Sequence, residues 1–308
     1  MPAAWPRSWG SDPVTDLFGV PLPVLTGQAL IGLFNGAFYA LLSLGLAVIF
    51  GLLRIVNFAH GALYMLGAFT AYLIGEAFGL PFWALLVVAP LAVALFGALI
   101  ERFLLSHLRG LDPLYGLLLT FGIALVVEGL FQYRYGVAGR PFAAPPALSG
   151  VTNLGWLILP HYRTFVIAVA LAVCLGTWLL IERTRLGALL RAATENRPLV
   201  EAFGVNVPLL LTATYAFGTF LAAFAGVMAA PVFQVGPFMG SNLIIVVFAV
   251  VVIGGMGSIG GAIVAGFALG LLEGLTKVVY PEAANVVVFA VMAVVLFFRP
   301  AGLFGKPA

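Results

Sequence analysis

Long apolar stretches fill most of this chain, and short segments that carry most of its charged residues separate them. Apolar residues cover every face of these stretches, as in residues 166–173, whereas the strands of a membrane barrel alternate apolar and polar positions. Only a helix satisfies its own backbone hydrogen bonds in lipid, so we expect each stretch to be helical. Stretches close to the membrane-helix length of about 20 residues occur at 25–52, 55–75, 81–100, 114–132, 164–181, 209–230, 242–257, 261–278 and 283–298.

The pattern predicts an all-α fold, a polytopic transmembrane helical bundle of about eight or nine membrane helices. Glycines near 51–61 and 254–261 predict one or two interrupted helices, and residues 25–300 would form a single transmembrane domain. Composition agrees, because 63% of the 308 residues are hydrophobic, 8% are charged, and the mean hydropathy is +1.16. A soluble domain is about 45–50% apolar and 25% charged, so the surface of this chain suits a lipid bilayer.

Arginines orient the predicted bundle, since cytoplasmic connections carry an excess of basic residues. The connection 182–208 is the most basic segment and should be cytoplasmic. Counting from it makes the tail 1–24 and the proline-rich loop 136–163 external, and the tail 301–308 cytoplasmic. Nine spans, which we favour, place the termini on opposite sides; eight spans result if one glycine-interrupted stretch re-enters. Three arginines depart from this orientation by lying on the outer side: Arg134, Arg140 and Arg163.

Few residues suit catalysis or cofactor binding. The chain lacks a Gly-x-x-x-x-Gly-Lys-Ser/Thr phosphate loop. Its three histidines lie in separate segments without cysteine or carboxylate at metal-ligand spacing, and Cys174 is its single cysteine. The net charge of +3 is not clustered as nucleic-acid binding requires. We therefore expect no catalytic residue, cofactor, metal or nucleic acid, and any active transport must draw on a partner or an ion gradient.

The connection 182–208 also has a defined helical pattern. Residues 186–193 form a short amphipathic helix, Asn196 suits the cap of a second helical turn, and Gly204 suits a left-handed helix end. Arg197 and Glu201 are four residues apart and can pair on one face. The segment is either a docking element that exposes apolar side chains beside charges, or a solvated linker with the usual cytoplasmic basic excess.

Four motifs, taken in order, resemble one transporter family. They are Asn57-Phe58-Ala59-His60-Gly61, the string from Arg191-Ala192-Ala193 to Ala202-Phe203-Gly204-Val205-Asn206, the glycine-rich segment 254–261, and the ending 299–305. The resemblance runs from about residue 26 to 306 and is to the branched-chain amino-acid ABC permeases, inner-membrane subunits of high-affinity importers. The connection 182–208 resembles the cytoplasmic coupling loop of that family, with Arg191 standing where other importers have a glutamate.

The resemblance implies a multi-pass inner-membrane permease with a cytoplasmic C-terminus. Its implied partners are a second permease subunit (a related chain or a second copy), two cytoplasmic ABC ATPases and an external solute-binding protein. Its solute would be an amino acid, in particular a branched-chain or aliphatic one. The residues that we assign to ATPase coupling are Arg191, Glu195, Arg197, Leu199, Glu201, Phe203 and Gly204.

Polar residues and glycines inside the apolar stretches are the candidates for a translocation path, because polar groups at membrane depth generally face the protein interior. Glu128 either meets a substrate ammonium or lies at the membrane edge near Arg134. Asn57 and His60 either line the path or cap and bond helices, and Asn35 lies in line with Gln28. Gly254, Gly255 and Gly257 break a helix, as a gate or as a tight turn.

Two further patterns indicate packing. Glu273 and Lys277 are four apart and can pair. Small residues at every fourth position from Ser258 to Gly274 would let helices approach closely.

The alternative function is a stand-alone secondary transporter or channel for small solutes, but Glu128 and Glu273 make a poor coupling-ion site. A third class, a purely structural membrane protein, would move no solute.

Overall fold

A computed structural model describes residues 16–17, 20–53 and 55–305 of the chain. Most of the expected tail 1–24, together with Arg54 and Lys306, lies outside these residues. The all-α fold is confirmed, with short strands only at β1 and β2 (Asp16–Leu17, Val20–Pro21) and at β3 and β4 (Val151–Asn153, Ile158–Pro160) in the described part. The long helices are α1 Leu22–Leu53, α2 Ala59–Phe78, α3 Phe82–Phe103, α4 Pro113–Tyr135, α5 His161–Arg183, α8 Val207–Phe233, α10 Ile259–Val279 and α11 Ala284–Phe298.

Eight helices of the described chain are long and apolar enough to cross a membrane, which confirms a bundle of eight or nine. The remaining stretch forms the helix α9 (Ser241–Gly254), whose 14 residues extend about 21 Å at 1.5 Å per residue, less than the roughly 30 Å of hydrocarbon. It is short because the preceding residues 234–240 contain Pro237 and two glycines, and because Gly255 ends it with a positive φ of 102°.

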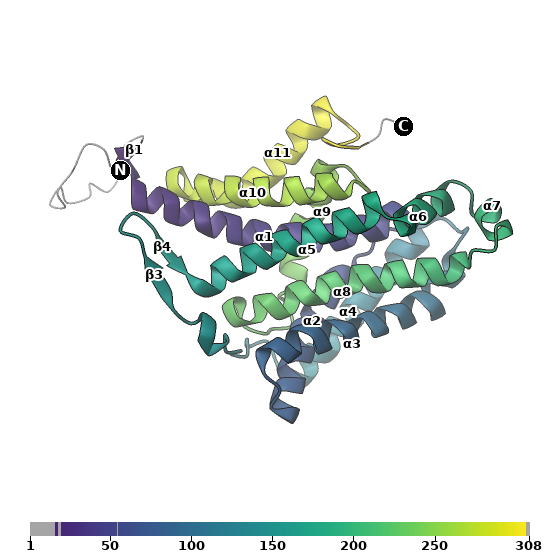
Figure 1. The fold of residues 1–308 in the computed structure, drawn as a ribbon, viewed down its shortest axis with the longest axis horizontal. Helices are drawn as coiled ribbons and strands as arrows, with labels where there is room; N and C mark the ends of the chain where they lie inside the picture. Colours follow the sequence, from purple (N-terminus) through teal and green to yellow (C-terminus); the bar gives the residue numbers. More distant parts are fainter. Residues whose placement is uncertain (1–15, 18–19, 54, 306–308) are drawn as a thin grey trace.

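The ridge of small residues on α10 packs against α1, as the spacing predicts. A Cβ added to Gly266 would lie 2.6 Å from the Ala40 Cα, and one added to Gly274 would lie 2.7 Å from the Gly32 Cα. In Figure 1, α1, α10, α5 and α8 run side by side along the long axis of the molecule. The second face of α8 packs against α2 and α3, so α1 and α8 hold the largest share of the buried residues.

The bundle has two distinct ends. At the first, which we call the hairpin end, α1 begins beside the β3–β4 hairpin, and the Thr26 hydroxyl donates a hydrogen bond to the Trp156 carbonyl (3.0 Å). The connection 136–160 there contains little helix, only the 3₁₀ turn Pro146–Leu148 (η2). The opposite end, the coupling end, carries α6 (Arg185–Glu195) and α7 (Arg197–Ala202) (Figure 1).

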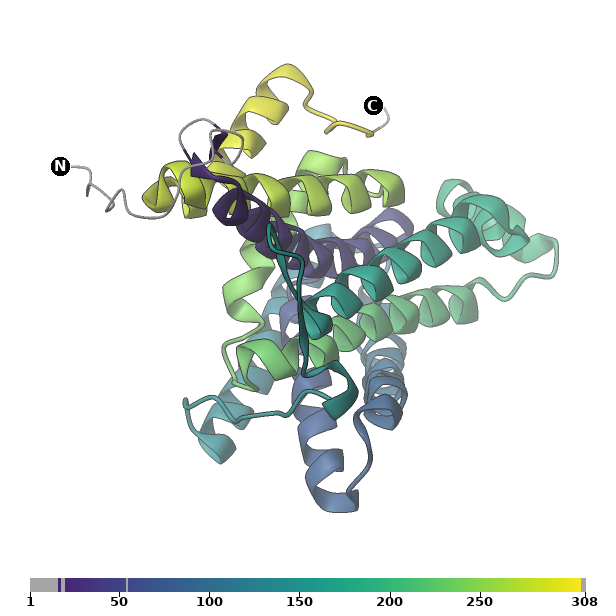
Figure 2. The same ribbon diagram turned by 60° about the vertical axis from the view of Figure 1, so that its left-hand side comes forward.

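The C-terminal residues 299–305 return to the coupling end, where Gly302 packs on Gly255 and Gly257 packs on Gly51 of α1. The short α9 therefore still reverses the chain direction, as a full span would. Figure 2 shows α10 and α11 above α1, with the described C-terminal segment lying beside the bundle. The described residues nearest the two termini consequently lie at opposite ends of the bundle.

Candidate translocation path and coupling element

The helix α2 begins inside the bundle rather than at its end. The His60 Nε2 lies 3.0 Å from the carbonyl oxygen of Leu42, and Leu42 stands eleven residues before the last residue of α1 (53 − 42). At 1.5 Å per residue, α2 starts about 16 Å in from the end of α1. Residues 55–58 therefore run back into the bundle as non-helical chain, which is tolerated at such depth only where protein or a water-filled cavity surrounds it.

Asn57 meets Tyr215 of α8 at this point, and Asn57, His60 and Tyr215 are all at most 1% exposed. The Tyr215 hydroxyl lies beside the Asn57 amide. Within the part of the chain that the structure describes, the His60 Nδ1 has no hydrogen-bond partner, and the Asn57 amide and the Tyr215 hydroxyl have none apart from each other. Buried polar groups are nearly always paired, so this incompletely paired cluster is a candidate for contact with a solute.

The capping alternative for Asn57 is wrong, whereas an interhelical contact by His60 is confirmed. Phe58 occupies the cap position of α2, and its backbone N–H bonds to the Thr120 hydroxyl of α4 (3.2 Å). Sequence reasoning missed Tyr215 and Thr120. A tyrosine inside an apolar stretch was the available signal for the first, because a buried hydroxyl generally requires a partner.

The first residues of α2 and α9 touch each other in the same region. A Cβ on Gly61 would lie 2.8 Å from the Gly240 carbonyl oxygen, so only glycine fits this approach. The Phe58 ring stacks on Phe248 of α9 and meets Phe121 of α4 edge-on, with centroids 6.2 and 6.1 Å apart. Two helices that start within the bundle are thus joined at their N-terminal ends.

The predicted break at Gly254–Gly261 is confirmed, with left-handed backbone at Gly255 and Gly257. The structure also shows that the C-terminal segment contacts this break, which sequence reasoning did not predict. The backbone N–H groups of Leu303 and Phe304 donate to the carbonyls of Ile253 (2.8 Å) and Gly254 (3.1 Å). The C-terminal segment therefore pairs with carbonyls that the end of α9 would otherwise leave free.

The candidate path residues do not form one cluster within the chain. Asn57 and His60 lie at the start of α2, and the three glycines of the break lie at the coupling end. Asn35 is half-buried on α1, and Glu128 is half-buried on α4. Glu128 forms no ion pair with any described residue, and the guanidinium of Arg134 lies over the Tyr135 ring instead (5.3 Å).

The helical pattern of the connection 182–208 is confirmed in detail. Asn196 accepts a hydrogen bond from the backbone N–H of Leu199 (3.1 Å), Gly204 has a φ of 82°, and Arg197 pairs with Glu201 (2.8 Å). Leu199 and Phe203 are 53% and 80% exposed. Such exposure of large apolar groups beside charges fits a docking element better than a solvated linker.

Arg191 and Glu195 differ in what they face. Arg191 donates to the carbonyl of Ile181 (2.9 Å) and approaches Glu182 (3.4 Å), so it fastens α6 to the end of α5. Glu195 is exposed and free of any ion pair to the described residues. Arg191 thus holds α6 against the end of α5, while the Glu195 carboxylate points to no described partner.

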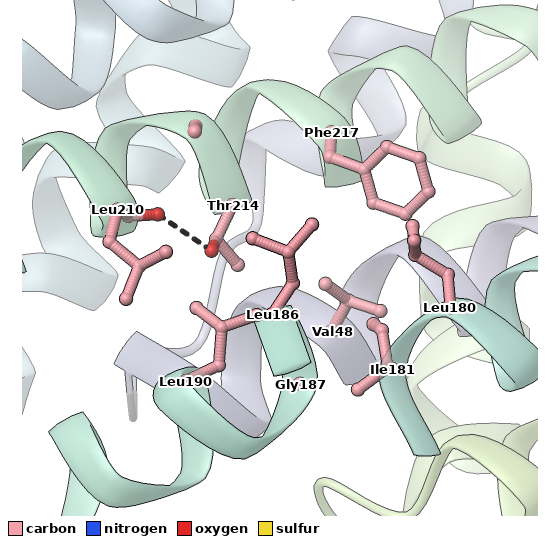
Figure 3. Close-up of a pocket in the computed structure, with 10 residues that line it drawn as sticks. Val48, Leu180, Ile181, Leu186, Gly187, Leu190, Leu210, Thr214 and Phe217 are labelled. Atoms are coloured by element: carbon pink, nitrogen blue, oxygen red, sulfur yellow. Dashed lines mark hydrogen bonds between the residues drawn. The ribbon is translucent and has the colours of Figure 1, made fainter. Parts of the chain in front are cut away.

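An apolar cavity of about 210 Å³ lies between α6 and the bundle (Figure 3). Leu186 and Leu190 of α6 face Val48, Ile181 and Phe217 across it. The Thr214 hydroxyl donates to the Leu210 carbonyl (2.8 Å), which satisfies that polar group within α8. The cavity thus lies where α6 meets α1, α5 and α8.

A buried ion pair that sequence reasoning missed lies at the coupling end. Glu101 of α3 is fully buried, pairs with Arg109 in the connection to α4, and accepts a hydrogen bond from the Thr212 hydroxyl of α8. Burial, and in addition the nearby guanidinium of Arg197, lower the pKa of Arg109. The available signal was a carboxylate at the end of an apolar stretch with arginine eight residues later.

The remaining titratable groups do not suggest a metal centre. No three His, Cys, Asp or Glu side chains among the described residues converge as metal ligands. Glu273 is bonded to the Tyr39 hydroxyl (2.7 Å) and to Lys277 (2.6 Å), so the predicted pair is confirmed as a structural one. Cys174 is buried as a free thiol.

Membrane-length helices, two interrupted helices that meet inside the bundle, and an amphipathic helical connection at one end define a polytopic membrane transport component. The family model described as "Branched-chain amino acid transport system / permease component" matches residues 28–296. The chain belongs to this family of ABC importer permeases, as its four motifs indicate.

Characterised relatives match along nearly the whole chain. The permease BraD of Pseudomonas aeruginosa is 30% identical, with 91% of this chain and 95% of BraD aligned. LivH of Escherichia coli is 28% identical over the same shares, and LivM of that organism is 27% identical over 86% of this chain and 67% of LivM. All three are described as high-affinity branched-chain amino acid transport system permease proteins. No solved structure matches the chain.

Proposed function

We propose that this permease carries branched-chain or other aliphatic amino acids across the cell inner membrane, driven by two cytoplasmic ATPases. The alignment with BraD over almost the full length of both chains carries the proposal. An external solute-binding protein would deliver the solute to the hairpin end. The basic coupling end, with 182–208 and the C-terminus, would be cytoplasmic.

The second permease of the complex would be a related chain. Both LivH and LivM of Escherichia coli align with this sequence, which supports descent of two paired permeases from one fold. The half-buried Glu128 and the largely exposed helix α4 would then face a path shared between the two subunits, because an unpaired carboxylate is costly against lipid.

The transport cycle would begin at the coupling element. ATP-driven closure of the ATPases would move α6 and α7 into the space of the apolar cavity. That movement would separate Gly61 from Gly240 and open the interrupted helices. Asn57 and His60, with Tyr215, would then line the opened path and meet the solute, while Asn35 would lie further along it. Gly254, Gly255 and Gly257 would act as the hinge at the coupling end.

A stand-alone ion-driven transporter is a weaker alternative. It needs a coupling-ion site, yet Glu273 is engaged by Tyr39 and Lys277. Glu101 is engaged by Arg109 and Thr212. Within the apolar stretches of the described chain, this leaves Glu128 as an isolated carboxylate, which is poorer than the oxygen-rich sites that cations require.

Association with the ATPases tests the proposal. The chain in nanodiscs, with its second permease, should capture the ATPases encoded by neighbouring genes. Arg197→Glu combined with Leu199→Asp should abolish capture, because both side chains are exposed on α7. Leu154→Asp, 46% exposed at the hairpin end, is the control. Capture that persists unchanged in the double variant would contradict the assigned coupling role.

A further inference from the structure

A second cytoplasmic connection lies next to the coupling element. A cleft of about 300 Å³ separates α6 and α7 from residues 108–113, which join α3 to α4. Thr194 and Arg197 line one side, and Arg109, Leu111 and Asp112 line the other. Two connections that are about 90 residues apart in the sequence thus form one surface.

The 108–113 side of the cleft is held firmly. Arg109 is anchored to Glu101, which also accepts the hydrogen bond from Thr212 of α8. Asp112 accepts a hydrogen bond from the backbone N–H of Leu114 (2.9 Å) and so caps α4. A partner that engages this wall would act directly on α3, α4 and α8, without going through α6.

The side of the cleft between Arg109 and Arg197 offers donors to an acidic group, whereas the Asp112 carboxylate in the same cleft caps α4. The guanidinium groups of Arg109 and Arg197 lie close enough to influence one another. Each is held by one carboxylate and has further N–H donors, because a guanidinium carries five. A carboxylate placed between them would relieve their repulsion. Leu111, 54% exposed, adds an apolar contact at the rim.

We propose that this cleft is a second docking surface for the ATPase subunit, and that it receives an acidic side chain flanked by apolar residues. The inference rests on the importer function proposed above. The ATPase would grip α7 through Leu199 and Phe203 and the cleft through Arg109 and Arg197. Its closure would then displace the connection between α3 and α4 together with the coupling element.

Opposite charges at one exposed position test the chemistry of the occupant. We would replace Leu111 by Asp and, separately, by Lys, and measure the affinity of the ATPases for the permease pair in nanodiscs. Leu111→Asp should weaken binding about tenfold or more, as loss of an interface hot spot does, whereas Leu111→Lys should bind equally or more tightly. Leu154→Asp at the hairpin end should change nothing.

The second test neutralises the buried Glu101–Arg109 ion pair. Glu101→Gln with Arg109→Gln removes both charges, leaves no buried charge unpaired, and takes one guanidinium out of the cleft. It should elute as a folded protein and also bind the ATPases several-fold more weakly. Equal weakening by Leu111→Asp and Leu111→Lys would exclude an acidic occupant.

Two other outcomes would also overturn the cleft proposal. In the first, all cleft variants bind the ATPases normally while Arg197→Glu with Leu199→Asp does not bind them. This result would leave the importer function standing. The other is unchanged ATPase binding together with loss of co-purified anionic phospholipid, which would identify a lipid site. Failure of the unmodified chain to bind the ATPases would instead contradict the proposed function itself.

Discussion

Asn57 is the residue whose environment departs furthest from what stability alone would select. Its amide is 1% exposed, and among the described residues it is paired with no group other than the neighbouring Tyr215 hydroxyl. An unsatisfied buried polar group costs about 1–3 kcal/mol. Retaining such a group beside the Tyr215 hydroxyl, where a helix starts inside the bundle, is understandable if both groups are used when the path opens.

Replacing Asn57 by Ala should therefore leave the melting temperature of the permease unchanged or higher, while ATP-driven amino-acid uptake falls at least tenfold. Ser43→Ala is the matched control, because the Ser43 hydroxyl is fully buried but bonded to the carbonyls of Ala40 and Ala262. It should lose about 1 kcal/mol of stability and retain uptake. A lowered melting temperature in Asn57→Ala with normal uptake would make Asn57 a structural residue.

At the scale of elements, Gly187 determines how α6 meets the bundle. A Cβ at this position would overlap the Ile181 carbonyl at the end of α5, so α6 crosses α5 only with glycine there. Gly187→Ala should displace α6 and weaken ATPase capture at least tenfold, with the transmembrane bundle still folded. Gly176→Ala, in open space on α5, should bind the ATPases normally. Normal capture by Gly187→Ala would show that the position of α6 is not critical.

The pairing of the C-terminal segment with α9 can be tested with two left-handed glycines. A Cβ on Gly302 (φ 81°) would lie 2.5 Å from the Gly255 Cα, whereas Gly155 (φ 82°) lies in open space. Both alanine variants carry a left-handed backbone cost of roughly 1–2 kcal/mol. Only Gly302→Ala should expose the C-terminus to protease and lower uptake. Equal protease sensitivity in the two variants would mean that the segment is not held on α9.

Much of the element level was predictable from the sequence, for definite reasons. Membrane helices, the α6–α7 pattern and the α10 ridge follow from local periodicity and caps, so residues such as Asn196, Gly204 and Gly266 indicated them. The start of α2 inside the bundle, the Glu101–Arg109 pair and the docking of 302–305 on α9 depend on long-range contacts. No local pattern specifies those contacts, and the glycines that allow them could equally mark turns.

At the scale of the whole molecule, close glycine contacts join segments of the bundle at two depths. Gly61 contacts Gly240 in the interior, and Gly51 contacts Gly257 at the coupling end. These glycine contacts join backbone to backbone, with no side chains interlocked between them. In an assembly of two such permeases, the helix starts at Gly61 and Gly240 would be connected through α9 to the end of the bundle that carries α6 and α7.

Leucine uptake into proteoliposomes tests this account most directly. The complete assembly of this chain, its second permease, the ATPases and the external binding protein is reconstituted with ATP on the ATPase side. We predict accumulation that requires ATP and the binding protein, and that is abolished by Arg197→Glu with Leu199→Asp. Accumulation by this chain alone, driven by a sodium or proton gradient without ATP, would contradict the account.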